Sequence, residues 1–300
     1  MVRLEIAGNL PPAGSSVEES QKYTRWLATH HYENFSVATF LLPRALRQHF
    51  YNIYAYCRWS DDLADEVGNP DTALELLDWW EEELCRCYAG NSTHPVFIAL
   101  RETIHRFDIP QSPFSDLLKA FRSDQTVTRY PNWESVIDYC RYSANPVGCL
   151  VLYLGEYRDT ERQTLSGYTC TALQLANFWQ DVSRDLEKGR IYIPLDMLSA
   201  HSLTEADIIE RRFDERYAGL MRDLVARTRD LFDRGMPLTR MVRRNLRIDI
   251  ELFSHGGLAV LDAIESVGYN TLQQRPHLSG AKKLQLIGRA VGTHLFSRTA

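Results

Sequence analysis

One acidic helical pattern says most about the fold of this chain, and it reads Asn177-Phe178-Trp179-Gln180-Asp181-Val182-Ser183-Arg184-Asp185. Its oxygen donors Asn177, Asp181 and Asp185 recur every four residues, so on a helix they form one stripe, with neighbouring Cβ atoms roughly 5–6 Å apart. Apolar residues precede and surround the stripe at helical spacing. This favours a helix whose acidic face looks inward and not out to water.

The same pattern appears about 120 residues earlier, as Cys57-Arg58-Trp59-Ser60-Asp61-Asp62-Leu63-Ala64-Asp65-Glu66. Asp61 and Asp65 again share one helix face. Buried carboxylates repel one another and are costly to desolvate unless a cation neutralises them. Two such faces across a cavity would make a box of acidic oxygens, suited to Mg²⁺ ions that carry the diphosphate of a substrate.

Each copy also has a simpler interpretation as a solvated acidic helix end, since a lone D-x-x-x-D is a weak signal. The second copy favours the ligand interpretation, because Leu173, Leu175 and Phe178 crowd around its stripe. Two cations and a phenol then follow at Lys188, Arg190 and Tyr192, and cations are what a diphosphate needs. A helical scaffold without catalytic activity would instead place the aspartates in solvent.

Composition excludes several classes of protein. The chain has 300 residues, 44% hydrophobic and 24% charged, as in an ordinary globular protein. A net charge of −5 and a pI near 6.0 argue against a nucleic-acid partner. Six cysteines without a C-x-x-C pair favour reduced thiols in a cytoplasmic protein. No stretch is long and apolar enough to span a membrane.

Apolar periodicity predicts an all-α fold from Glu19 onward. We expect a disordered N-terminal tail over residues 1–18 and one domain over 19–300, because no linker divides the chain. The longer helices are expected at Pro43–Glu66, Arg162–Glu187, Thr204–Leu231, Pro237–Val267 and Ser279–Phe296. Bundles of this kind place ligand sites between their helices.

These motifs predict a charge-driven reaction. Mg²⁺ held by carboxylates would stabilise charge on a departing diphosphate and so favour carbon–oxygen cleavage. The remaining carbocation would need aromatic faces and a dry pocket. The chain has 15 Tyr, 12 Phe and 6 Trp residues, enough to line such a cavity, although aromatic residues more often serve core packing.

The chain resembles the squalene/phytoene synthase family of head-to-head prenyl synthases, from about Tyr23 to about Lys283. The resemblance rests on Ile53-Tyr54-Ala55-Tyr56-Cys57-Arg58 before Asp61 and Asp65, Leu173-Gln174-Leu175-Ala176-Asn177 before Asp181 and Asp185, and Arg190-Ile191-Tyr192-Ile193-Pro194. It implies a single-domain isoprenoid synthase helical bundle with a central active-site cavity. The Mg²⁺ ligands that it implies are Asp61, Asp65, Asn177, Asp181 and Asp185. The residues that it places at the substrate diphosphate are Tyr54, which is also a catalytic candidate, Arg58, Arg190, Tyr192 and Arg275.

Three departures from the usual family pattern point to one branch. They are Asn34-Phe35 where many relatives have Ser-Phe, Ser143-Ala144-Asn145-Pro146-Val147-Gly148 in place of a small Ala-Gly stretch, and Gln180 where arginine is common. These stretches look like the bacterial hopanoid-pathway branch, whose members act as hydroxysqualene synthases. The resemblance therefore implies a carbon–oxygen lyase that ionises presqualene diphosphate, quenches the rearranged cation with water and does not require NADPH.

Asn34 and Asn145 are candidates for orienting that water, because an amide can hold it by hydrogen bonds. Asn145 could equally start a helix before Pro146. The alternative activities are a farnesyl-diphosphate farnesyltransferase, that is a presqualene diphosphate or squalene synthase acting on farnesyl diphosphate, and a phytoene (dehydrosqualene) synthase. We expect a cytoplasmic protein that attaches reversibly to the inner membrane surface near Lys282, Lys283 and Arg289, with neighbouring enzymes of the pathway as further partners.

Overall fold

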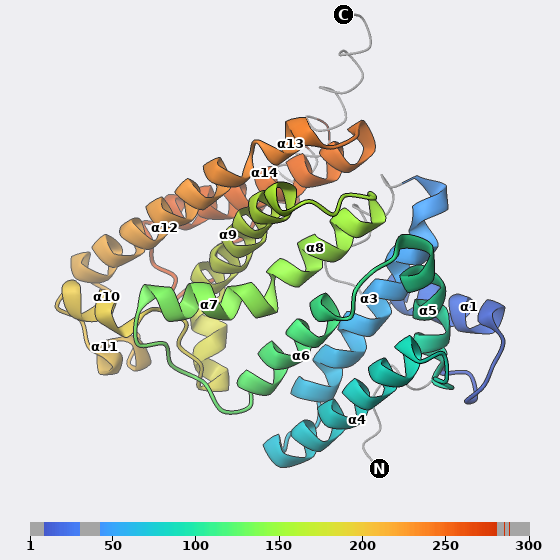
Figure 1. Ribbon diagram of the computed structural model, residues 1–300. Helices are drawn as coiled ribbons and strands as arrows, with labels where there is room; N and C mark the ends of the chain where they lie inside the picture. The colour runs from blue at the N-terminus through green and yellow to red at the C-terminus, as the bar shows by residue number, and fades with distance from the viewer. Residues whose placement is uncertain (1–8, 31–42, 281–284, 286–287, 289–300) are drawn as a thin grey trace, which may run out of the picture. The chain divides into compact units, whose positions relative to one another are not determined.

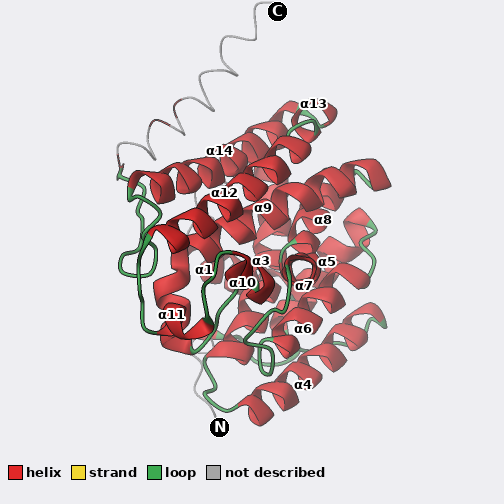
Figure 2. Ribbon diagram, turned by 90° about the vertical axis from the view of Figure 1, so that its left-hand side faces the viewer, coloured by secondary structure: helices red, strands yellow, loops and turns green. Residues whose placement is uncertain are grey.

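The computed structural model describes residues 9–30, 43–280, 285 and 288, and its secondary structure in these ranges is helical (Figure 1). No strand occurs among them; Figure 2 shows helices joined by loops, and one isolated parallel bridge joins Arg129 and Ile191. The prediction of an all-α fold is confirmed. The cysteines are all free thiols.

The chain divides into two compact units, each built of helices from two stretches of the sequence. Residues up to Thr126 and Pro146–Asp159 form unit 1, with α1 (Val17–His30), α3 (Arg44–Asp65), α4 (Pro70–Tyr88), α5 (Pro95–Phe107), α6 (Ser112–Ser123) and most of α8 (Asn145–Leu154). Residues Val127–Asn145 and those from Thr160 onward form unit 2, with α7 (Trp133–Ser143), α9 (Thr160–Asp185), the 3₁₀ turn η2 (Leu186–Lys188), α10 (Leu195–Ala200), α11 (Glu205–Ile209), α12 (Glu215–Gly235), α13 (Leu238–Met241) and α14 (Arg244–Ser266). The single domain over 19–300 stays a prediction.

In unit 1 one face of α3 is fixed by buried hydrogen bonds to α1, α4 and α5. Asn52, fully buried, accepts from Thr24 Oγ1 at 2.7 Å and donates to the carbonyl of Ala99 at 2.9 Å. Further along the helix, Trp59 Nε1 donates to the hydroxyl of Tyr23 at 2.9 Å, and Ser60 Oγ accepts from Trp80 Nε1 of α4 at 3.0 Å. Satisfied polar groups of this kind specify a unique packing. These contacts fix the rotation of α3 about its axis, and so fix the direction in which the opposite face, with Asp61 and Asp65, points.

In unit 2 the long helix α9 packs on α12 and α14 through an apolar face. Trp179 is fully buried there, and its indole N–H donates to Thr228 Oγ1 of α12 at 2.9 Å. Phe232 and Leu261 extend the same core. Trp59 and Trp179 thus stand two residues before Asp61 and Asp181, respectively, and each anchors the helix that carries an acidic stripe.

Three predicted segments differ from the structure. The helix predicted over Pro237–Val267 is two helices, α13 and α14, because the backbone becomes extended at Val242 (φ −119°, ψ 158°). The helix predicted over Thr204–Leu231 is two helices, because the chain turns at Arg211 (φ 54°) and Asp214 caps the start of α12 by accepting from the backbone N–H groups of Arg216 and Tyr217. The tail predicted over 1–18 is ordered in its second half, where Gly14 N donates to Thr93 O at 2.8 Å and α1 begins at Val17. Residues 1–8 lie outside the described residues, as does nearly all of the helix predicted at Ser279–Phe296.

Replacing either of two adjacent glycines in α14 by alanine is expected to have opposite effects on stability. A Cβ on Gly257 would overlap the buried Phe232 ring and approach Leu173 Cδ2 to 2.9 Å, whereas a Cβ on Gly256 meets nothing within 4 Å. Gly257→Ala is expected to destabilise the fold by about 1–3 kcal/mol through overpacking. Gly256→Ala is expected to stabilise it by up to about 1 kcal/mol, since alanine is the better helix former. Urea unfolding of both variants checks this, and equal effects would contradict the close packing of α14 on α9 and α12.

Candidate active site

The exposed side of α3 in unit 1 presents four of the predicted site residues in one stripe. Tyr54, Arg58, Asp61 and Asp65 follow one another at intervals of three or four residues, which places them on one face of a helix. Tyr54 and Arg58 are half-buried, Asp61 has 48% of its side chain exposed, and Asp65 is exposed. Unit 1 therefore brings together the phenol, the guanidinium and both carboxylates of the first motif.

Arg58 is held in this stripe by a carboxylate that is not on the predicted ligand list. Its Nη2 lies 2.5 Å from Oδ1 of Asp62, whose side chain is only 4% exposed, and its Nη1 lies 3.4 Å from Oδ2 of Asp61. The contact with Asp62 is an ion pair without hydrogen-bond geometry, since neither Asp62 Oδ1 nor Arg58 Nε has a hydrogen-bond partner among the described residues. Asp62 thus fixes the guanidinium beside Asp61.

Burial sets the electrostatics of this stripe. It raises the pKa of Asp62 to about 6, with Asp61 adding to the rise and Arg58 opposing it. Burial also raises the pKa of the Tyr54 phenol, and the charge of Arg58 opposes that rise. Tyr54 is therefore a protonated hydrogen-bond donor at neutral pH.

The second stripe lies along the last turns of α9 in unit 2. Asn177 is exposed, and Asp181 and Asp185 are partly buried behind it along the helix. Asp181 has 14% of its side chain exposed and is paired with Arg275, whose Nε and Nη2 donate to its two carboxylate oxygens. The structure thus places Arg275 on a predicted metal ligand, whereas the resemblance assigned it to the diphosphate.

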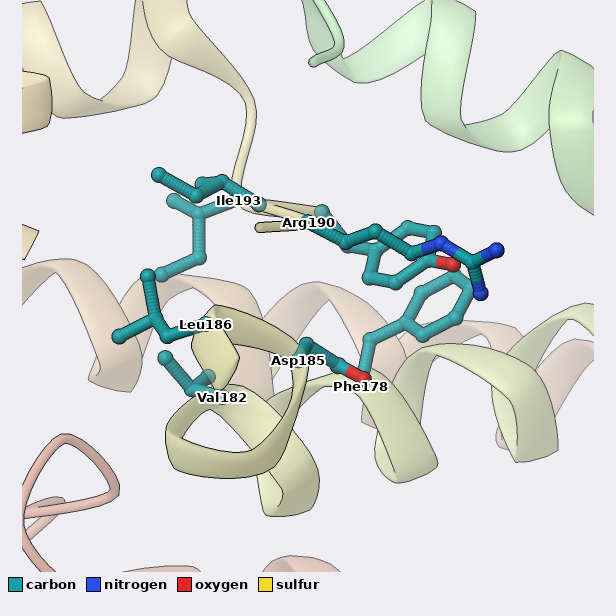
Figure 3. Close-up of a pocket in the computed structure, with 8 residues that line it drawn as sticks. Phe178, Val182, Asp185, Leu186, Arg190 and Ile193 are labelled. Atoms are coloured by element: carbon teal, nitrogen blue, oxygen red, sulfur yellow. The ribbon is translucent and has the colours of Figure 1, made fainter. Parts of the chain in front are cut away.

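The acidic stripe is followed by Lys188, the last residue of η2, and by Arg190, which Figure 3 shows among the side chains that line a recess. Gly189, at φ 71°, ends η2, and its carbonyl accepts from Arg129 Nη1 at 2.6 Å. Ile191 N then donates to Thr128 O at 3.0 Å. This turn brings Arg190 back towards Asp185, and both line a small recess that opens to solvent.

Two aromatic side chains, Phe178 and Tyr192, are among the residues that line this recess. The ring of Tyr192 stacks on Phe178 with centroids 3.7 Å apart and planes 4° from parallel. Tyr130 also stacks against Tyr192, at 5.6 Å. An aromatic surface beside a carboxylate and a guanidinium matches what a charged head on an apolar substrate needs.

Asp185 has the most perturbed pKa of the predicted site residues. Its pKa is raised to about 7, chiefly by burial and also by the neighbouring charge of Asp181, while Arg190 and Lys188 oppose the rise. The two cations expected after the acidic motif therefore act on Asp185. A divalent cation would lower this pKa by stabilising the carboxylate.

The prediction that both acidic faces are buried is wrong for Asp65 and Asn177, which are exposed in the structure.

Asn145 accepts a hydrogen bond from Thr171 Oγ1 at 3.0 Å, so part of its amide is used to hold α9. It is also the first residue of α8. Its proposed role with water stays a prediction. Asn34, Lys282, Lys283 and Arg289 lie outside the described residues.

The donor set fits a hard divalent cation. Asn177, Asp181 and Asp185 offer oxygen ligands on one helix face, and Asp61 and Asp65 offer two more on α3. In the described part of the chain no three or more His, Cys, Asp and Glu side chains cluster as a metal site of their own. Mg²⁺ does not require such a cage, because it binds through one or two carboxylates together with substrate phosphates and water.

Three residues position the site in ways that were not predicted from the sequence. Asp62 could have been found, because Arg58 and Asp62 have the i, i+4 spacing of a helical ion pair. Arg129 gave no such signal, and Gln180 stood out only as a departure from the family pattern, without an indication of its partner. Arg129 reaches Gly189 across 60 residues, and Gln180 Nε2 donates to Pro276 O at 2.8 Å across 96 residues.

The described part of the chain is helical, and two of its helices, α3 and α9, each carry a stripe of oxygen donors. The chain belongs to the squalene/phytoene synthase family, whose model matches residues 28–282. It is 30% identical to a phytoene synthase of Arthrospira platensis over 90% of this chain and 91% of that protein, and 31% identical to a 15-cis-phytoene synthase of Synechocystis over 90% and 84%.

Solved structures show the same fold. The squalene synthase HpnC from Alicyclobacillus acidocaldarius is 43% identical, with a TM-score of 0.82 over 89% of this chain and 99% of that one. A dehydrosqualene synthase is 23% identical, with a TM-score of 0.84 over 94% and 98%. Members of this family are enzymes that act on isoprenoid diphosphates and ionise them with a divalent metal. None of the described helices is long and apolar enough to cross a membrane.

Proposed function

We propose that this protein is a hydroxysqualene synthase. In this reaction the carbon–oxygen bond of presqualene diphosphate breaks, diphosphate leaves, and the rearranged carbocation takes a hydroxyl group from water and releases a proton. The reaction is redox-neutral, so NADPH is not needed.

This proposal rests on the identity and environment of Gln180. This position, directly before Asp181, often holds arginine in the family that the sequence resembles. Here it is a buried amide that donates to the Pro276 carbonyl at 2.8 Å. Because Gln180 is neutral and its amide is already hydrogen-bonded, the site has one basic group fewer than that of a relative with arginine at this position. This favours a substrate with one diphosphate over the condensation of two farnesyl diphosphates, which must hold two. The 43% identity to a squalene synthase favours squalene chemistry over phytoene chemistry.

In the proposed reaction the two acidic stripes act on the same diphosphate. Asp61, Asp65, Asn177, Asp181 and Asp185 would hold Mg²⁺, and the bound metal would supply charge neutralisation for the leaving group. Arg58, fixed by Asp62, and Arg190, beside Asp185, donate to diphosphate oxygens. Tyr54 stays protonated and donates from the same face as Arg58. Tyr192 and Phe178 supply an apolar aromatic wall.

We expect the purified protein to turn over presqualene diphosphate with Mg²⁺ alone, at a rate that NADPH does not change. In H₂¹⁸O the product should be hydroxysqualene that carries the label. Mass spectrometry of the product with and without NADPH checks this. Absolute dependence on NADPH, or an unlabelled hydrocarbon product, would contradict the proposal and support squalene synthesis.

The second candidate is the condensation of two prenyl diphosphates, which the names of the curated phytoene synthases favour. Parallel incubations with farnesyl and geranylgeranyl diphosphate separate it from the first. Formation of presqualene diphosphate or phytoene would support this candidate, and only unchanged substrate would support the hydroxysqualene assignment.

A further inference from the structure

The segment that follows α14 is fastened to the end of α9 at two neighbouring residues. Arg275 binds both carboxylate oxygens of Asp181, with Nη2 to Oδ2 at 3.1 Å. Gln180 binds the carbonyl of Pro276 at 2.8 Å. Upstream, the Thr271 hydroxyl lies 2.7 Å from the buried Tyr217 hydroxyl. The backbone around Arg275 is therefore held from both sides.

The two contacts on α9 differ in how easily another ligand from solvent can replace them. The Gln180 contact is buried and neutral. The Arg275 contact is partly open, with 25% of the Arg275 side chain and 14% of the Asp181 side chain exposed. A cation can therefore reach Asp181 and displace the guanidinium without uncovering the core, while Gln180 keeps the segment in place.

The guanidinium occupies the ligand atoms that a metal needs. A bidentate arginine uses both oxygens of a carboxylate, and Mg²⁺ would bind the same oxygens. Asp181 and Asp185 are like charges on one helix face, and Asp181 contributes to the raised pKa of Asp185. A counter-ion on Asp181 relieves this repulsion, and either cation can supply it.

We propose that Arg275 is a displaceable counter-ion of Asp181, which occupies the carboxylate in the metal-free protein and yields it to the divalent cation. The released guanidinium is then available to the substrate diphosphate, a second step that rests on the proposed function. Arg275 is thus a determinant of metal affinity. It lowers the affinity of the free protein for Mg²⁺ and couples metal binding to substrate binding.

The test measures metal binding without substrate, by titrating Mn²⁺ and following free Mn²⁺ by electron paramagnetic resonance. Arg275→Gln removes the competing charge and is expected to bind Mn²⁺ about 10-fold more tightly than the unaltered protein, a difference of about 1.4 kcal/mol. Arg275→Lys keeps the charge but not the bidentate geometry, and should lie between the two. Arg216→Gln, which removes an exposed arginine paired with Asp214 in the same unit, should not change the affinity.

A double-mutant cycle assigns the effect to Asp181. In an Asp181→Asn background, Arg275→Gln should give no further gain, because the shared carboxylate is gone. Equal or weaker Mn²⁺ binding by Arg275→Gln would overturn the inference, and so would the absence of Mn²⁺ binding to every variant. Tighter Mn²⁺ binding by a protein that makes no hydroxysqualene would support the counter-ion role and contradict only the proposed reaction.

Discussion

Asp61→Asn and Asp181→Asn are each expected to lower kcat with presqualene diphosphate by about 10³-fold or more, equivalent to about 4 kcal/mol of transition-state stabilisation. Each variant removes the charge of a proposed metal ligand in one of the two stripes and should leave the helix that carries it intact. Far-UV circular dichroism should therefore be nearly unchanged. Steady-state release of diphosphate measures the effect.

Two carboxylates outside the stripes provide matched controls. Asp116 on α6 and Asp138 on α7 pair with Lys119 and Arg141 on their own helices. Asp116→Asn and Asp138→Asn should leave kcat within about twofold of the unaltered enzyme, since such pairs contribute little. Near-normal activity of Asp61→Asn or Asp181→Asn would remove that stripe from the metal site.

Asp249→Asn is expected to stabilise the protein in a strongly pH-dependent way. Asp249 on α14 is 4% exposed, and neither of its carboxylate oxygens has a hydrogen-bond partner in the described part of the chain. Burial raises its pKa to about 7. An aspartate whose pKa is higher in the folded than in the unfolded state stabilises the fold at low pH. That contribution is lost as the pH rises through about 7.

The size of this effect follows from the same shift. Between pH 5 and pH 8.5 the unaltered protein should lose about 2–3 kcal/mol of unfolding free energy relative to Asp249→Asn. Comparing the two proteins at each pH cancels the other titrating groups and the constant cost of burying an amide. Urea unfolding at both pH values measures the difference. Asp138→Asn, which removes an exposed carboxylate, serves as the control for the substitution itself. A pH-independent difference would show that Asp249 is ionised in a compensated site.

The two helices that carry the acidic stripes were predictable from interactions between residues close together in the sequence. The predicted Pro43–Glu66 and Arg162–Glu187 agree with α3 and with α9 followed by η2, because the apolar spacing and the prolines act within a few residues. The break before α12 was also local, since Asp214 is an N-cap, but the apolar spacing that continues past it concealed this signal.

The contacts that shape the site were predictable only where they are local. Arg58 and Asp62 are one helical turn apart, and their pairing follows from that spacing. Arg275 reaches Asp181 across 94 residues, and its role depends on how the chain returns to α9. Tertiary packing decides such pairs. The resemblance therefore named Arg275 as a site residue without revealing its partner.

We propose that the stripes on α3 and α9 hold metal around one diphosphate. Anomalous diffraction from crystals grown with Mn²⁺ and a non-hydrolysable farnesyl thiodiphosphate would locate this metal. We expect Mn²⁺ peaks bound by Asp61 or Asp65 and by Asn177, Asp181 or Asp185, all contacting the same thiodiphosphate, with Arg275 released from Asp181. Metal confined to one stripe, or a diphosphate bound away from both, would contradict it.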